Sequence, residues 1–81
     1  NWKRHQVSQT EAEQIFLNRP VVIGSSRAHP ESELRFFALG RTDAGRLLVI
    51  VFTLRGSLLR VISARPMSRR ERRKYEQAIL P

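Results

Sequence analysis

The sequence predicts an α+β fold: an antiparallel β-sheet, a meander of three to four strands, flanked by an N-terminal and a C-terminal helix. The helices are predicted because S-x-x-E, the capping box that starts helices, occurs at residues 8–11 and again at 68–71. The sheet is predicted because apolar, often β-branched runs separated by turn residues lie between these two motifs. With 81 residues in all, residues 1–81 are expected to form a single domain.

The first helix is expected to begin after Ser8 and to end before Pro20. Ala12, Ile15 and Phe16 recur at helical spacing and fall on one face. We expect this apolar face to pack against the sheet.

Four apolar segments follow, at residues 21–23, 34–39, 47–54 and 58–64. The third is apolar almost throughout, which is typical of an interior strand that is covered on both faces. The segments are separated by a polar loop at residues 24–33, a turn at 41–45 and a tight turn at 55–57 that contains Gly56, where a positive φ is favourable.

Two arginines lie in or directly after the last predicted strand. Strict alternation puts Arg60 on one face of the last strand and Arg65 on the opposite face, so both cannot lie on one side of a regular strand. Arg65 ends the strand beside the second helix. It is therefore the better candidate for a site shared with Arg69 and Arg70.

The charge is concentrated near the end of the sequence. The chain has 15 Lys and Arg against 7 Asp and Glu, a net charge of +8, and residues 55–81 contribute +6 of it. Such a patch attracts polyanions, because neutralised phosphates release their counterions. The stretch lacks the broad apolar face of an interfacial helix, so nucleic acid is favoured over a membrane.

The second helix is expected to end at Pro81, with Tyr75, Ala78 and Ile79 as its apolar stripe. The residues expected to bind the nucleic acid are Arg55, Arg69, Arg70, Arg72, Arg73 and Lys74. The alternative is a solvated helix surface, although so many like charges in one helix repel one another.

Other classes of protein are excluded by composition. The absence of cysteine excludes disulfides, thiolate metal sites and cysteine nucleophiles, and it fits a cytoplasmic protein. The longest apolar run, residues 47–52, is too short to span a bilayer, and we recognise no signal peptide. Carboxylates and histidines do not cluster at metal-ligand spacing, so no metal site or cofactor is expected.

The sequence resembles the BrnT family over nearly its whole length. The second half carries R-V-I-S-A-R at residues 60–65 and R-R-E-R-R-K-Y at 69–75, and the first half carries His5 and V-S at residues 7–8, followed by Glu11 and Ala12. The strand with which the family usually begins precedes the position of Asn1, so we expect it to be absent from this sequence. Gln6 stands where the family usually has glycine.

The resemblance implies a ribonuclease toxin of a type II toxin–antitoxin pair, with a fold similar to RelE-type toxins. Such a toxin inhibits growth unless its antitoxin binds it. The implied partners are RNA and a BrnA-like antitoxin with a ribbon-helix-helix DNA-binding domain. Operator DNA is reached only through that antitoxin.

RNA cleavage without metal uses the ribose 2′-hydroxyl as nucleophile. It requires a proton acceptor, a proton donor and cations that stabilise the charged phosphorane. Arg65 is the first candidate for the cation, with Arg60 and Arg69 next, because a guanidinium matches two phosphate oxygens. His5 and Glu71 are the acid–base candidates. The structural alternatives are that Arg65 pairs with Glu71, that Glu71 only caps the helix, and that His5 is structural.

A second reading is a non-catalytic module that binds nucleic acid or protein through its arginines. Few aromatic residues are available to stack bases, and most are expected to lie in the core, which argues against a reader of single-stranded RNA. An RNA digestion assay distinguishes the enzyme from the binding module.

Overall fold

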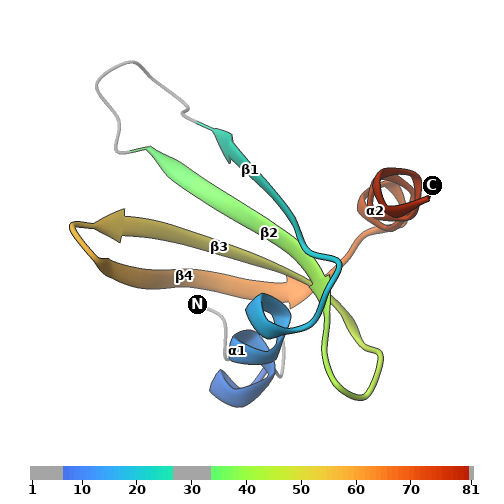
Figure 1. Ribbon diagram of the computed structural model, residues 1–81, viewed down its shortest axis with the longest axis horizontal. Helices are drawn as coiled ribbons and strands as arrows, with labels where there is room; N and C mark the ends of the chain where they lie inside the picture. Colours follow the sequence, from blue (N-terminus) through green and yellow to red (C-terminus); the bar gives the residue numbers. More distant parts are fainter. Residues whose placement is uncertain (1–6, 27–33, 81) are drawn as a thin grey trace.

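The computed structural model describes residues 7–26 and 34–80. In this part of the chain the elements are α1 (Gln9–Leu17), β1 (Val22–Ser26), β2 (Arg35–Arg41), β3 (Leu47–Arg55), β4 (Leu58–Pro66) and α2 (Arg69–Ile79) (Figure 1). The strands form one open sheet in the order β1-β2-β3-β4, and every neighbouring pair is antiparallel. The predicted α+β class, with an antiparallel meander and two helices, is confirmed.

Both helices begin with the capping box that the sequence predicts. The Ser8 hydroxyl accepts from the Glu11 N–H at 3.0 Å, and the Glu11 carboxylate accepts from the Ser8 N–H at 3.1 Å. Ser68 and Glu71 make the same two hydrogen bonds at 3.2 and 2.8 Å. Each box satisfies two backbone N–H groups that a helix start leaves unpaired.

The two helices pack on opposite faces of the sheet. On the α1 face, Ile15 joins a core with Leu48 and Ile50 of β3. On the α2 face, Tyr75 joins a second core with Val49 of the same strand. The expected coverage of the third segment on both faces is confirmed. Both helices gather near one end of the strands, so the β3–β4 turn at the other end projects beyond them (Figure 1).

The first strand is longer than the sequence predicts, because it continues through Gly24 to Ser26. Gly24 does not begin the loop; it pairs with Phe37 of β2. A side chain at Gly24 would collide with the Phe37 ring, whose Cε atoms lie 2.7 and 2.8 Å from where its Cβ would stand. A glycine is therefore needed at position 24, because the Phe37 ring lies too close to the backbone for a side chain.

The expectation that Arg60 and Arg65 lie on opposite faces is wrong, because β4 contains a β-bulge. Ile62 is an extra residue with no partner on β3. Arg60 pairs with Thr53 and Arg65 pairs with Val49, and paired residues of an antiparallel ladder share a face. Since Val49 and Thr53 are four residues apart on β3, both arginines lie on the α2 face.

The second helix buries less than the sequence predicts. Tyr75 is only 2 % exposed, and its hydroxyl donates to the Pro20 carbonyl at 2.7 Å. Ala78 is exposed and Ile79 is 37 % exposed, so the expected stripe is wrong at these two positions. Tyr75 is the buried contact between this helix and the sheet, and Glu71 adds a hydrogen-bonded contact with Arg65 of β4. No helix in the described ranges is long and apolar enough to cross a membrane.

Candidate nucleic-acid interface

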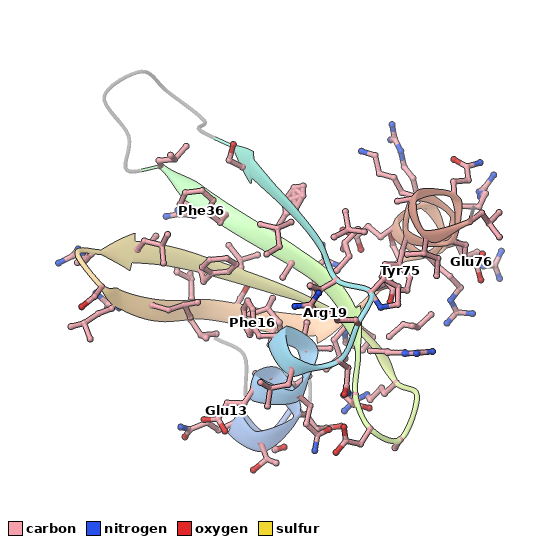
Figure 2. All side chains as sticks on the ribbon, in the orientation of Figure 1. Glu13, Phe16, Arg19, Phe36, Tyr75 and Glu76 are labelled. Carbon is pink, nitrogen blue, oxygen red and sulfur yellow. The ribbon has the colours of Figure 1, made fainter. Side chains whose placement is uncertain are left out.

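The α2 helix presents its positive charges to solvent. Its five basic residues, Arg69, Arg70, Arg72, Arg73 and Lys74, are all exposed. Within residues 7–26 and 34–80, none of the five forms an ion pair. Figure 2 shows nitrogen-tipped side chains spreading outward from α2, whereas the labelled Tyr75 points inward. Because unneutralised cations on one helix repel one another, this surface is suited to a polyanionic ligand.

A bidentate ion pair joins the end of β4 to the start of α2. Arg65 donates from Nη1 to Glu71 Oε1 at 2.7 Å and from Nη2 to Glu71 Oε2 at 2.6 Å. The hydrogen bonds from Arg65, and then those from Ser68, lower the pKa of Glu71 to about 2 against the opposing effect of burial. The same contact raises the pKa of Arg65. Pairing of Arg65 with Glu71, the predicted structural alternative to a catalytic role, is therefore present as a contact between strand and helix.

The ion pair does not use all the donors of Arg65. Its Nη1 also donates to the Pro66 carbonyl at 3.2 Å, so three of the five guanidinium N–H groups are engaged. The side chain remains 38 % exposed. Two N–H groups can therefore bind a second anion while Glu71 fixes the orientation of the guanidinium.

A hollow of about 340 Å³ lies beside this pair on the α2 face. Its floor is apolar and comes from β2 and β3, with Phe37 and Val51 among its residues. Its polar lining carries cations from three elements, Arg35 of β2, Arg65 of β4 and Lys74 of α2, together with the Glu71 carboxylate that pairs with Arg65. A site with an apolar floor and a cationic rim suits a ligand that is both flat and anionic.

A second hollow, of about 310 Å³, continues along the same face. It is lined by Arg35, Thr53, Arg60, Val61 and Ile62. Because Arg35 lines both hollows, the residues Arg60, Arg35, Arg65 and Lys74 border two adjoining hollows on one face and are here called the basic track. From Val49 to Thr53, the partners of Arg65 and Arg60, the track runs for about 13 Å.

Sequence reasoning missed Arg35 and Phe37. The signal was present, because alternation along residues 35–39 puts Arg35, Phe37 and Leu39 on one face. It could not be interpreted from sequence alone, because both faces of β2 carry apolar residues. Only the positions of the two helices show which face remains partly open.

The other predicted site residues lie in different places. Arg60 is on the basic track, Glu71 holds Arg65, and Arg55 is exposed at the end of β3. His5, the acid–base candidate, and His29 lie outside the described residues. Among the residues that the structure describes, no group of three or more His, Cys, Asp or Glu could hold a metal ion.

Comparison with known proteins adds one match. The sequence model of a family described as "Ribonuclease toxin, BrnT, of type II toxin-antitoxin system" matches residues 1–71. No curated protein sequence matches the chain.

Proposed function

Since this chain belongs to the BrnT family of type II ribonuclease toxins, we propose that it cleaves RNA on the α2 face of its sheet, without a metal ion. The observation that supports this location is the hollow in which an apolar floor meets cations from β2, β4 and α2. Phosphate recognition by several guanidinium groups is typical of sites that stabilise a charged phosphorane.

In the proposed reaction, the ribose 2′-oxygen attacks the adjacent phosphorus and the bond to the 5′-oxygen breaks. A proton leaves the 2′-hydroxyl, and a proton is delivered to the leaving 5′-oxygen. Arg65 donates its two remaining N–H groups to the phosphate oxygens that gain charge. Arg60, farther along the basic track, binds a neighbouring phosphate.

Glu71 acts in this proposal as a positioning residue. With a pKa of about 2 it is ionised at neutral pH, so its carboxylate is a weak proton acceptor and cannot be the proton donor. Its two hydrogen bonds instead hold Arg65 at the edge of the hollow. His5, the other acid–base candidate, lies outside the described residues, so its role as proton acceptor stays a prediction.

The exposed cations of α2, together with Arg55, hold the RNA backbone outside the hollow. Their contribution is electrostatic and independent of sequence, and it weakens as salt rises. Lys74 belongs to both groups, because it lines the hollow and also lies beside Arg70 and Arg73 on the outer surface of α2.

Type II pairing implies an antitoxin protein, and we propose a BrnA-like, ribbon-helix-helix antitoxin that silences the toxin by covering β4 and α2. An acidic segment would neutralise the +6 charge of residues 55–81. Operator DNA would be contacted by the antitoxin. Hydrogen exchange of the complex is expected to show protection over both elements, and an interface that leaves Arg65, Arg69 and Arg70 open would contradict occlusion.

The experiment that tests the proposed activity is digestion of single-stranded RNA by the purified chain, with and without EDTA and with and without the co-encoded antitoxin. Cleavage that persists in EDTA and stops with antitoxin is expected. Cleavage abolished by EDTA would exclude the metal-free mechanism. RNA binding without cleavage in any condition would instead favour the non-catalytic binding module.

A further inference from the structure

Phe37 stands apart from the other phenylalanines that the structure describes. On the α1 face, the rings of Phe16 and Phe36 lie 5.3 and 5.6 Å from the ring of Phe52. Phe37 follows Phe36 in β2, so alternation turns it to the opposite face, where it lines the hollow beside Arg65. It is the phenylalanine that the α1-face core does not use, and its ring packs against the α2-face core that contains Tyr75.

The ring of Phe37 lies across the backbone of Gly24. A Cβ at Gly24 would stand 2.7 and 2.8 Å from the two Cε atoms and closer still to Cζ. Such similar distances mean that this end of the ring lies flat over the glycine. One face of the ring is therefore supported by β1, and the half-buried side chain contributes its remaining surface to the hollow.

Cations flank this ring along the basic track. Arg35 lies two residues before Phe37 on the same face of β2, and Arg65 and Lys74 line the same hollow of about 340 Å³. A nucleotide has matching chemistry, with a flat base for the ring and a phosphate on either side for the cations. An apolar protein side chain would fill the floor but would leave Arg35 and Lys74, which form no ion pair among the described residues, without a counter-charge.

We propose that Phe37 is a platform on which one unpaired base of an RNA strand stacks, while Arg35 on one side and Arg65 with Lys74 on the other bind the adjoining phosphates. This inference rests on the proposed function in placing RNA on the α2 face. Stacking is tolerant of base identity but requires an unpaired base. Phe37 therefore selects single strands, whereas the outer cations of α2 attract any polyanion.

The test uses two probes that cannot be cleaved because their 2′-oxygens are methylated. One is a short 2′-O-methyl oligoadenylate, and the other is the same oligomer without its central bases. Phe37→Leu keeps an apolar side chain over Gly24 but removes the aromatic face. Phe16→Leu, on the α1 face, is the matched control, and the melting temperature of each variant reports folding.

Phe37→Leu is expected to weaken oligoadenylate binding about tenfold. Its affinity for the oligomer without central bases should change little. Phe37→Tyr should retain wild-type affinity for oligoadenylate, and Phe16→Leu should change neither affinity. Equal affinities of wild type and Phe37→Leu for oligoadenylate would overturn the proposal. Equal losses on both probes would also overturn it, because the ring would then only support Gly24 or hold another kind of ligand.

The two proposals fail in different ways. A wild-type chain that prefers the base-containing probe but never digests unmodified RNA would reject the ribonuclease mechanism and leave the stacking site standing. A chain that digests RNA, and whose Phe37→Leu variant binds oligoadenylate as wild type does, would reject the stacking site alone.

Discussion

Arg65 combines two roles in one guanidinium, because it holds Glu71 and still has two N–H donors for the hollow. We expect Arg65→Ala to lower RNA cleavage about a hundredfold, or about 3 kcal/mol in the barrier. RNA affinity should fall much less, because the cations of α2 remain. Cleavage rate, affinity and melting temperature are measured on the same sample.

The matched control is Arg46→Ala. Arg46 also pairs with the glutamate of a capping box, since its Nη1 lies 3.2 Å from both carboxylate oxygens of Glu11. That pair belongs to α1, and neither residue lines the hollow. A similar loss of cleavage in both variants would show that Arg65 acts through stability and not on the phosphate.

Glu71 also links stability to pH. Its pKa falls from 4.5 to about 2 on folding, so the ionised pair stabilises the fold above about pH 4.5 and that contribution is lost as pH falls towards 2. Glu71→Gln keeps a capping side chain but cannot ionise. The melting temperature of wild type should exceed that of the variant at neutral pH, and the difference should shrink over this interval.

A difference in melting temperature that stays constant from pH 7 to about pH 2 would contradict this prediction, because linkage requires it to change where Glu71 titrates. Glu11 also has a lowered pKa, owing first to its hydrogen bond with the Ser8 backbone and then to Arg46. Its effect is common to wild type and Glu71→Gln, so it cancels in the comparison.

The residues that belong to local motifs were the easiest to predict from the sequence. Ser68 and Glu71 could be identified because a capping box needs only four consecutive residues, and Arg65 could be nominated because it lies just before that box. Phe37 could not be placed, because its exposure depends on where α2 crosses the sheet. Contacts between distant elements leave no such local signature.

The α2 helix is expected to govern how RNA affinity depends on salt. Arg73→Glu should weaken binding to all single-stranded sequences and reduce the slope of log affinity against log salt by about 0.7 for each phosphate that is no longer neutralised. Arg19→Glu makes the same charge change in the segment between α1 and β1, and it should leave the slope nearly unchanged. Equal effects of the two substitutions would show that only the net charge matters.

The β4 strand shows why alternation along a strand has limits as a predictor. The residues of 58–64 contain no glycine, proline or charge pattern that marks Ile62 as the bulged position. Its position is set by pairing with β3, which keeps Val61 opposite Phe52 and Ser63 opposite Val51. Strict alternation along the sequence therefore places Arg60 and Arg65 on opposite faces, whereas the bulge puts them on the same face.

Tyr75 joins distant parts of the molecule, because its hydroxyl donates to Pro20 in the segment between α1 and β1. Tyr75→Phe keeps the ring in its core but leaves the Pro20 carbonyl without this donor. We expect a loss of about 1 kcal/mol in the free energy of unfolding, or roughly 4–8 °C in melting temperature. An unchanged melting temperature would show that water replaces the hydroxyl.

The architecture of the whole sheet was predictable to the level of its class. Hydrophobic runs, turn glycines and two capping boxes were sufficient for an antiparallel meander between two helices. These local features did not show that the helices cover opposite faces. The residues that pack on each face of β3 come from segments that are distant in the sequence. The similarity to RelE-type toxins stays a prediction.

The shallow attachment of α2 has a dynamic consequence. Tyr75 is the only buried side chain of this helix, so α2 should open at a lower free energy than the sheet unfolds. Amide protons of Arg69–Ile79 should therefore exchange faster than those of β3. An RNA strand or an antitoxin that binds only the closed helix would slow this exchange, so its rate becomes a measure of occupancy.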